Sequence, residues 1–294
     1  MSAARDSANR DVTVVVTCFN YGAYLPEAVN SALEQEGGAP RVIVVDDGST
    51  EELTLSALER LPAGVRLIRQ KNAGLSAARN SGMRVAGTPY LIALDADDRL
   101  APAALQTLRA PLDRDPKLGF SYGIVQFFGS WEGTLDFPPF DPYKLLYRHM
   151  VGSTTLMRRE LFEQVGGFDP EFSAYEDWEF WVNAVSHGWR GVKVEAVTLL
   201  YRRHGDTMYT DARARYRMWY RKLRRKQPEL YGPAGRRALA TESDMGPLGR
   251  AIYRWWWGPR PLPARVELAL YAWLWRPGRR GGQGGATRTQ EQSA

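Results

Sequence analysis

The sequence predicts an α/β fold with a mostly parallel, Rossmann-like sheet that carries helices on both faces and is followed by a C-terminal helical extension. Two observations support this prediction. Short β-branched runs alternate with amphipathic helical segments through short connections, and acidic residues directly follow two of the runs. With 294 residues, of which 44% are hydrophobic and 24% charged, the chain is sufficient for one large globular domain and a tail.

The first hundred residues consist of repeated strand–helix units. Strands are expected at 11–17, 41–46, 65–69 and 90–95, and helices at 24–36, 50–60 and 72–86. Ser49 and Glu52 indicate a capping box for the second helix. Right-handed crossovers would place helices on both sheet faces and gather the ends of the strands at one edge, where ligands bind in such folds.

Beyond residue 100 the pattern becomes less regular. We expect a helix from Pro102, a strand at 119–127, a long loop at 129–150, a strand and helix within 152–168, a helix at 174–189, and strands at 192–194 and 197–202. The predicted organisation is a flexible N-terminus (1–10), a large α/β domain (11–210), a Trp- and Arg-rich helical extension (211–275) and a disordered tail (276–294).

The charge distribution is uneven. The net charge is +6, and residues 201–237 carry many arginines but few carboxylates. Such a segment can meet substrate phosphates, an anionic membrane or nucleic acid, and a solvated helix face explains it equally well. The single cysteine, Cys18, excludes an intramolecular disulfide, and the N-terminus has no apolar signal, so we expect a cytoplasmic protein.

The most informative motif is LDADD at 94–98, where an apolar strand leads directly into Asp95, Asp97 and Asp98. Clustered carboxylates repel one another unless a cation is present, and oxygen ligands suit Mg²⁺ or Mn²⁺, which take further ligands from substrate phosphates. Capping of the following helix explains an isolated DxD about equally often.

Two further acidic pairs follow the same logic. Asp46 and Asp47 end the second strand, where a carboxylate can accept hydrogen bonds from a nucleotide, although Asp, Gly and Ser also form simple turns. Glu176 and Asp177 begin a helix, where the helix dipole stabilises carboxylates by up to about 1 kcal/mol and also keeps a general base ionised.

A fourth motif, LLYRRHGDTM at 199–208, presents Arg202, Arg203 and His204 at the end of an expected strand. These side chains could contact a diphosphate or a metal ion. A lone histidine is nevertheless more often a surface or structural residue.

The ordered series VVVTCFN, VVDDGS, KNAGLSAARNSG, LDADD, GGFD, YEDWEFWVN and YRRHGD, across residues 11–210, resembles the family 2 glycosyltransferases of the GT-A fold. The resemblance implies an inverting, metal-dependent hexosyltransferase that uses a nucleotide diphosphate sugar, in bacterial-type surface polysaccharide or glycoconjugate synthesis. It implies a glycan or lipid-linked acceptor and no nucleic-acid partner. It also implies that residues 11–210 are the catalytic domain, nucleotide-binding at 11–100 and acceptor-side at 101–210, with an acceptor loop at 129–150.

The resemblance also implies roles for individual residues. Asp177 corresponds to the catalytic base, and Asp97 and His204 to ligands of Mn²⁺ or Mg²⁺. The implied contacts to the nucleotide sugar are Thr17, Phe19, Asn20, Asp46, Asp47, Lys71, Asn72, Arg79, Asp95, Ala96, Glu176 and Arg202. Among these, Asp47 corresponds to the base-recognising carboxylate and Asp95 to the ribose-side carboxylate.

Two other functions stay open at this point. A sugar-phosphate nucleotidyltransferase would share the nucleotide and the metal but needs a glycine-rich phosphate loop after the first strand, and CFNYGAYL contains one glycine. A catalytically inactive nucleotide-sugar-binding module would retain the carboxylates only as caps.

Residues 247–280 combine clustered tryptophans with arginines. Trp favours the lipid headgroup region and Arg favours anionic lipid, and the apolar stretch 266–275 is too short to span a bilayer. The segment therefore predicts either a peripheral contact with the cytoplasmic face of a membrane or, equally, packing on the catalytic domain or a homodimer contact.

Overall fold

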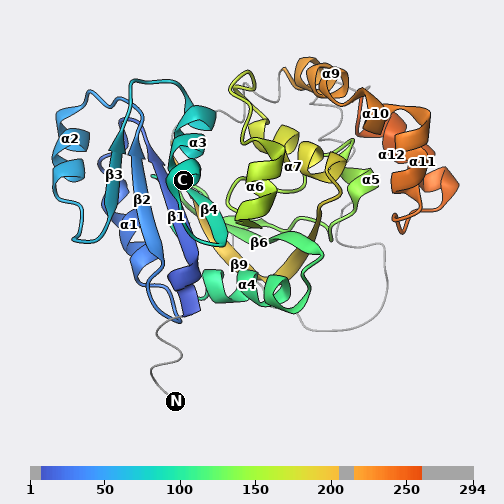
Figure 1. Cartoon of the computed structure of the whole chain (residues 1–294). Helices are drawn as coiled ribbons and strands as arrows, with labels where there is room; N and C mark the ends of the chain where they lie inside the picture. Colours follow the sequence, from blue (N-terminus) through green and yellow to red (C-terminus); the bar gives the residue numbers. More distant parts are fainter. Residues whose placement is uncertain (1–7, 205–214, 260–294) are drawn as a thin grey trace, which may run out of the picture.

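The structure is a computed structural model, and it describes residues 8–204 and 215–259 (Figure 1). The strands are β1 (Val12–Cys18), β2 (Arg41–Asp46), β3 (Arg66–Arg69), β4 (Tyr90–Asp95), β5 (Arg99–Leu100), β6 (Leu118–Gly129), β7 (Gly133–Leu135), β8 (Leu156–Arg158) and β9 (Arg190–Arg203). The helices are η1 (Ala8–Asp11), α1 (Leu25–Leu33), α2 (Glu52–Glu59), α3 (Leu75–Val85), α4 (Ala104–Arg114), α5 (Pro142–Leu145), α6 (Arg159–Val165), α7 (Glu176–Ser186), α9 (Tyr216–Lys226), α10 (Pro228–Tyr231), α11 (Pro233–Ala240) and α12 (Pro247–Trp256).

Within the described ranges, nine strands form one sheet in the order β3-β2-β1-β4-β8-β6-β9-β5, with β7 added beside β6. The pairs β1–β2, β1–β4, β2–β3 and β6–β9 are parallel. Strand β8 runs antiparallel to both β4 and β6, and β5 runs antiparallel to β9. The predicted mostly parallel α/β sheet is therefore confirmed.

Alternate residues of β1 face two separate cores. Val14 and Val16 pack with Leu25 of α1 and Leu105 of α4, whereas Val15 belongs to the core formed with α3, α6 and α7. Successive side chains of a strand point to opposite faces, so a continuous run of valines serves both cores. Helices on both faces of the sheet, as predicted, are the result (Figure 1).

Several local predictions are wrong. The N-cap of α2 is Glu51 and makes no side-chain capping bond, so Ser49 and Glu52 do not form a capping box. A single strand, β9, replaces the two strands expected at 192–194 and 197–202. Its register with β6 is irregular, and this irregularity accommodates the residues between the two expected strands. The expected loop 129–150 contains β7 and α5.

The N-terminal boundary also differs from the prediction. Asn9 is fully buried and donates hydrogen bonds to the carbonyls of Glu36 and Gly38, at 2.9 and 2.6 Å, so residues 8–10 are not a flexible segment. Residues 1–7, residues 205–214, and the apolar stretch and tail predicted beyond residue 259 lie outside the described residues.

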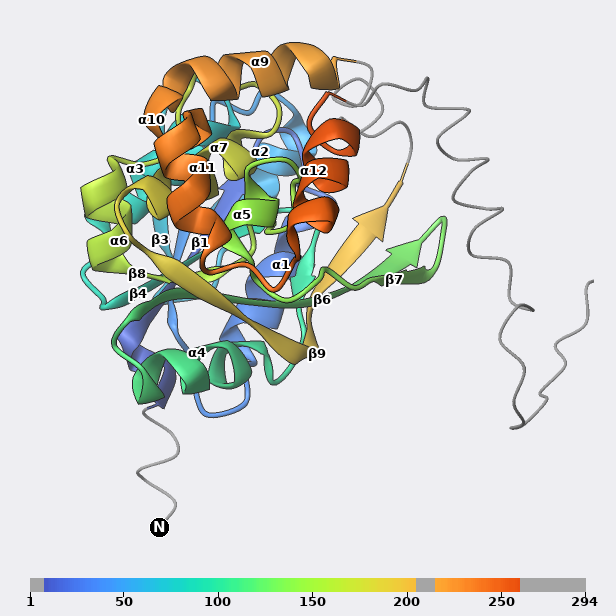
Figure 2. The ribbon, with the colours of Figure 1, turned by 90° about the vertical axis from the view of Figure 1, so that its right-hand side faces the viewer.

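Helix α9 packs against α7 through a face of aromatic side chains. Tyr216 and Tyr220 stack on Trp178 of α7, with ring centroids 5.6 and 6.0 Å away. Trp219 and Leu223 of the same helix are also buried. Figure 2 looks onto α9, α11 and α12, which gather at the end of the molecule away from α2 (Figure 1). No described helix combines the length and apolarity needed to cross a membrane.

Candidate functional site

The carboxyl ends of β1, β2 and β4 meet at one edge of the sheet, as the crossovers predict. Thr17 pairs in register with Val45 on one side and with Asp95 on the other. Its hydroxyl donates a hydrogen bond of 3.2 Å to Asp95 Oδ1. The backbone N–H of Ala96, whose side chain is buried, donates to the carbonyl of Thr17. The structure thus brings these three sequence-predicted residues together.

Arg79 connects this edge to the start of α7. It projects from α3 and is only 1% exposed, and its guanidinium donates to Glu176 Oε1 at 2.7 Å and to Asp95 Oδ1 at 2.9 Å. Burial and the charge of Asp177 raise the pKa of Glu176, which Arg79 partly offsets. A planar guanidinium can hold two carboxylates at fixed positions. Arg79 therefore fixes the end of β4 relative to Asp177.

Asp177 is the second residue of α7. The N-cap of this helix, Tyr175, occupies the left-handed region at φ 58°. The Oδ2 of Asp177 lies 2.9 Å from Nε2 of His149, and its Oδ1 accepts from the N–H of Trp178 at 2.8 Å. Burial disfavours the charged forms, yet the opposite charges dominate. They lower the pKa of Asp177 below 3.8 and raise that of His149 above 6.5. Both shifts favour the charged forms, an Asp177 carboxylate beside a His149 imidazolium.

His149 is a site residue that the sequence analysis missed. It follows α5, in the segment interpreted as an acceptor loop, and its neighbour Met150 is fully buried. The apolar residues Leu145, Leu146 and Met150 at the end of that segment were the available indication that it enters the core, where all three are buried. The contact with Asp177, 28 residues away in the chain, has no sequence periodicity that could predict it.

Asp97 and His204 come together across the β4 and β9 ends. Asp97 Oδ2 lies 2.9 Å from His204 Nε2, and both side chains are partly exposed, at 24% and 31%. Burial and the nearby charge of Asp95 raise the pKa of Asp97. Among residues 8–204 and 215–259, no three His, Cys, Asp or Glu side chains form a metal-holding group. A Mg²⁺ or Mn²⁺ ion with two protein ligands and several diphosphate oxygens would fit this donor set.

Asn20 and Arg202, which were predicted to contact the nucleotide sugar, form hydrogen bonds with other residues of the protein. The Oδ1 of Asn20 accepts hydrogen bonds from the N–H groups of Thr50 and Glu51, and thereby supports the start of α2. The Arg202 guanidinium donates to the Asp97 carbonyl at 2.8 Å and to Glu27 at 2.7 Å. Both side chains therefore organise loops at the edge.

Asp47 holds the loop between β3 and α3. It is 4% exposed and accepts hydrogen bonds from the Gln70 side chain at 2.7 Å and from the N–H groups of Ala73 and Gly74 at 2.9 and 2.8 Å. A carboxylate has about four acceptor positions, so one remains for a nucleobase N–H. Asp46, also buried, accepts from the N–H of Ser49 at 2.9 Å.

Gly48 allows the close approach of the two loops at this edge. Its φ is +78°, and a Cβ there would lie 2.7 Å from the Asn72 nitrogen. Lys71 and Asn72 are exposed beside it, and Phe19 is 43% exposed at the end of β1. An exposed ring at this position offers a stacking surface for a planar base.

Comparisons with known proteins agree with this geometry. Residues 13–175 match the family described as "Glycosyl transferase family 2", and residues 145–227 match "Glycosyltransferase like family 2". An uncharacterized glycosyltransferase from Haemophilus influenzae is 25% identical over 177 residues, which are 58% of this chain and 60% of that protein. The chain thus spans less than two thirds of that relative.

Two other proteins are similar to this chain. A PGL/p-HBAD biosynthesis glycosyltransferase from Mycobacterium bovis is 28% identical over 183 residues, which are 60% of this chain and 70% of that protein. The structure of S. aureus TarS 1-349 in complex with UDP-GlcNAc has a TM-score of 0.62 and 17% identity, and the match covers 82% of this chain and 70% of that one. The latter likeness establishes the fold.

Proposed function

Because the chain belongs to glycosyl transferase family 2, we propose that it transfers a hexosyl group, with inversion, from a nucleotide diphosphate sugar to an acceptor hydroxyl. The Arg79 bridge is the observation that carries this proposal. It joins Asp95, on the proposed donor side, to Glu176, next to the proposed base. A base and a donor that are fixed relative to each other meet the positional requirement of a single displacement.

In the proposed reaction Asp177 accepts the proton of the acceptor hydroxyl. The acceptor oxygen then forms a bond to the anomeric carbon on the face opposite the leaving group. The bond from that carbon to the diphosphate oxygen breaks, and the nucleoside diphosphate leaves with the electron pair. The charge and hydrogen bond of His149, 2.9 Å from Asp177, keep the base deprotonated and oriented.

We propose that Asp97 and His204 hold the metal ion, with Asp95 and Thr17 at the ribose side, Asp47 and Phe19 at the base, and Lys71 and Asn72 near the phosphates. A bound Mn²⁺ or Mg²⁺ would neutralise negative charge on the diphosphate. Since TarS 1-349 was solved with UDP-GlcNAc, a UDP-sugar is the first donor to test.

Asp97→Ala is expected to weaken Mn²⁺-dependent binding of UDP by at least about tenfold, the scale on which changes at a metal site act. Isothermal titration calorimetry with and without Mn²⁺ measures this effect. Asp244→Ala, at an exposed carboxylate paired with Lys144, is the matched control and should bind like the wild type. An unchanged Mn²⁺-dependent affinity in Asp97→Ala would remove Asp97 from this role.

A donor-hydrolysis assay separates this function from its two alternatives. A glycosyltransferase slowly releases free sugar and nucleoside diphosphate from its donor in the presence of Mn²⁺. A nucleotidyltransferase instead forms nucleotide sugar from a sugar phosphate and a nucleoside triphosphate. An inactive binding module binds the donor and releases no product.

We also propose that α12 contacts an anionic membrane surface, in keeping with a lipid-linked acceptor at the cytoplasmic face. Leu248, Ile252 and Trp255 recur at helical spacing and are 74%, 56% and 59% exposed, and Arg254 is exposed beside them. An exposed apolar stripe flanked by a cation suits a headgroup interface. Trp257 behaves differently, since it packs toward the core with Arg148 over its ring.

Flotation with liposomes tests this contact. The full chain is expected to float with vesicles that contain anionic lipid at low salt, and the triple variant Leu248→Gln, Ile252→Gln and Trp255→Gln should lose most of that binding. Because all three side chains are exposed, the fold should persist, and circular dichroism checks this. A wild-type chain that stays unbound at low salt would contradict the proposal.

A further inference from the structure

A basic groove lies beside α3, and neither Asp97 nor His204 belongs to its lining. Its cavity measures about 840 Å³ and is bounded by α3, by the 165–171 loop after α6, and by α9. Five cationic side chains line it: Lys71, Arg84, Lys222, Arg225 and Lys226. The two carboxylates in its lining are Asp169 and Glu171. The groove therefore has an excess of positive charge.

The walls of the groove are held firmly. The side chain of Asn80 on α3 donates to the carbonyl of Phe168 at 2.7 Å and accepts from the N–H of the same residue at 2.8 Å. Gly167, at φ +95°, allows this approach, because a Cβ there would lie 2.5 Å from Asn80 Oδ1. A two-point clamp of this kind fixes the loop against the helix before any ligand arrives.

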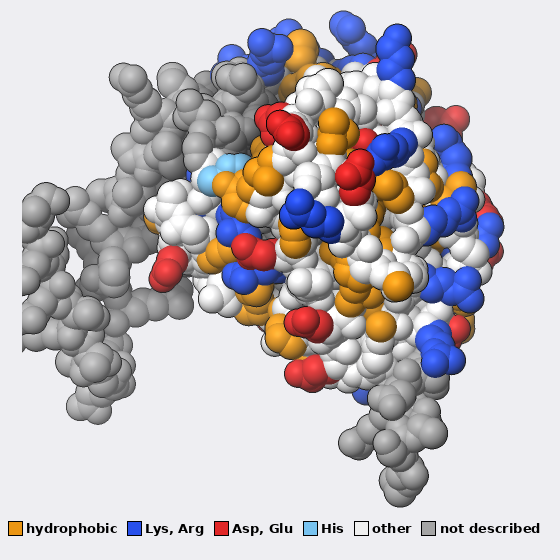
Figure 3. Space-filling view, turned by 90° about the vertical axis from the view of Figure 1, so that its left-hand side faces the viewer, with side chains coloured by type: hydrophobic (Ala, Val, Ile, Leu, Met, Phe, Trp, Pro, Cys, Tyr) orange, Lys and Arg blue, Asp and Glu red, His pale blue; other side chains and the backbone are white. Residues whose placement is uncertain are grey.

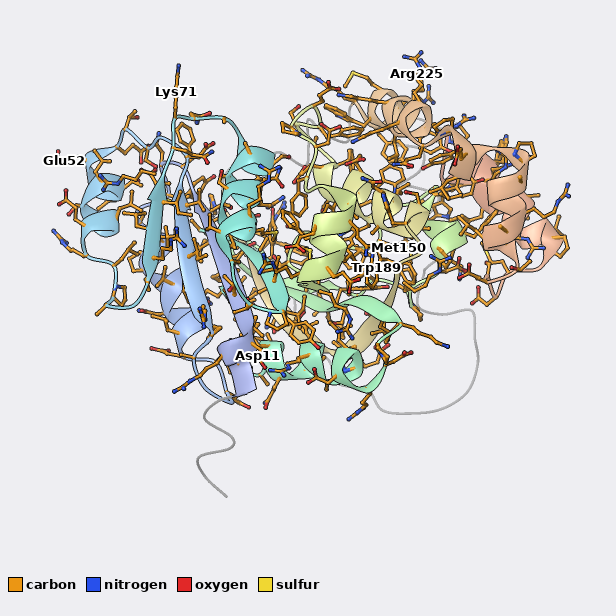
Figure 4. The ribbon with its side chains drawn as sticks, in the orientation of Figure 1. Asp11, Glu52, Lys71, Met150, Trp189 and Arg225 are labelled. Atoms are coloured by element: carbon orange, nitrogen blue, oxygen red, sulfur yellow. The ribbon has the colours of Figure 1, made fainter. Side chains whose placement is uncertain are left out.

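The cations in the groove fall into two groups. Lys226 pairs with Asp169 at 2.7 Å and Lys222 pairs with Glu171 at 3.2 Å, so both lysines are compensated. Lys71, Arg84 and Arg225 are exposed and form no ion pair with any residue in the described ranges. Figure 4 shows Lys71 projecting from the β3–α3 loop and Arg225 from α9, on the same side of the molecule.

Charge is distributed differently on another face of the molecule. The left-hand side of the view in Figure 1, which faces the viewer in Figure 3, carries acidic and basic side chains interspersed with apolar ones. Helix α9, by contrast, has the sequence YRMWYRKLRRK and no carboxylate. A local excess of one sign attracts ligands of the opposite charge.

One end of the groove is the loop that Asp47 holds. Gln70 links the two features, because its amide nitrogen donates to Asp47 at 2.7 Å and its carbonyl oxygen accepts from Ser81 on α3. The groove thus begins beside the proposed nucleotide site and extends from it toward α9. Phe168, the aromatic residue of the lining, is 1% exposed and offers no ring face for stacking. Recognition in this groove must therefore depend mainly on charge.

We propose that the groove binds a run of anionic groups, phosphates or carboxylates, on the acceptor glycan. This inference rests on the proposed glycosyl transfer and names the class of acceptor that the enzyme uses. Arg84 and Arg225 are uncompensated and are not used by the proposed donor site, and two such cations on different elements match repeated charges on a chain better than a single small anion. Arginine in particular binds phosphate and carboxylate through two parallel hydrogen bonds.

Three probes of equal length test the groove: linear hexaphosphate, hexagalacturonate and neutral maltohexaose. Calorimetry or fluorescence anisotropy measures their binding to the full chain at two salt concentrations. The groove variant Arg84→Gln/Arg225→Gln is compared with Arg114→Gln/Arg221→Gln, which removes the same charge from exposed positions outside the groove lining. Both pairs of arginines are exposed, so neither variant should disturb the fold.

At least one anionic probe is expected to bind the wild type, and maltohexaose is not. The groove variant should weaken that binding by about tenfold. The slope of log affinity against log salt concentration should become shallower by about 1.5, because two fewer charges are neutralised and fewer counterions are released. The control should stay within about twofold of the wild type. A preference for hexaphosphate or for hexagalacturonate, in support of the proposal, identifies the anion.

Equal weakening by both variants would show general charge attraction and overturn the proposal, as would failure of both anionic probes to bind the wild type. The same proteins are assayed for Mn²⁺-dependent hydrolysis of UDP-, GDP- and dTDP-sugars. Hydrolysis without probe binding overturns the groove proposal alone. Groove-dependent probe binding by a wild type that hydrolyses no donor overturns the proposed function and leaves the groove as an anion-binding site.

Discussion

Asp177→Asn is expected to lower turnover by at least about 10²-fold and to leave donor affinity within about twofold, the usual result of losing a general base. Asn has nearly the shape of Asp and keeps an oxygen that can accept the hydrogen bond from the N–H of Trp178. It lacks the charge and basicity that would take a proton from the acceptor hydroxyl. Turnover is measured with saturating donor, and affinity by calorimetry.

The pH dependence follows from the pair with His149. Burial opposes ionisation, but the charge of His149 lowers the pKa of Asp177 below 3.8, so the base is lost only as the pH falls through that lowered value. As the pH rises through the raised pKa of His149, above 6.5, the imidazolium loses its proton while Asp177 stays ionised. The contribution of Asp177 to turnover should therefore persist from neutral pH down to the acidic range of its lowered pKa, and it should not fall as His149 loses its proton.

Asp113→Asn is the matched control for this experiment, because Asp113 is an exposed carboxylate paired with Arg109. It should retain wild-type turnover. Wild-type-like turnover in Asp177→Asn would exclude Asp177 as the base. If the turnover of the wild type falls below about pH 6 and that of Asp177→Asn does not, His149 does not lower the pKa of Asp177.

Arg79→Met should reduce the free energy of unfolding by about 3–5 kcal/mol, because removing one partner of a buried ionic network leaves the others uncompensated. Arg79 is 1% exposed and supports both Asp95 and Glu176. Urea denaturation at pH 7 measures the loss. Arg79 lowers the pKa of Glu176, so without Arg79 that pKa should rise further, and protonation of Glu176 makes the loss smaller as the pH falls toward 5.

Arg159→Met is the matched control, because it makes the same substitution in an ion pair on the surface, that of Arg159 with Glu163. These residues lie one helical turn apart, 2.7 Å from each other, with exposed fractions of 37% and 57%. Arg159→Met should change the free energy of unfolding by less than about 0.5 kcal/mol. A loss below about 1 kcal/mol in Arg79→Met would mean that Asp95 and Glu176 do not depend on this bridge.

The strands that could be predicted are those whose burial requires a run of several apolar residues. The β-branched runs of β1 and β2 and the apolar run of β4 lie in the sheet interior, and polar residues mark their ends. Strands β5 and β7 have two and three residues, and such short elements depend on pairing with β9 and β6 rather than on their own pattern. Sequence periodicity therefore does not detect them.

The same distinction applies to the candidate site. Asp47, Asp95 and Asp97 were identifiable because each follows a recognisable strand. His149, by contrast, reaches Asp177 from an irregular segment, and the support that Asn20 gives to α2 depends on a hydrogen bond between two loops. Contacts of this type arise from the tertiary fold, and the residue type alone does not indicate the partner.

The stacking of α9 on α7 has a consequence for how the chain unfolds. Trp178 is two positions past Glu176 in a fully buried environment, and the rings of Tyr216 and Tyr220 form one side of that environment. Detaching α9 would expose these aromatic surfaces to water and loosen the helix that carries Asp177. Helices α7 and α9 therefore belong to one cooperative unfolding unit. The C-terminal boundary of that unit lies beyond residue 210.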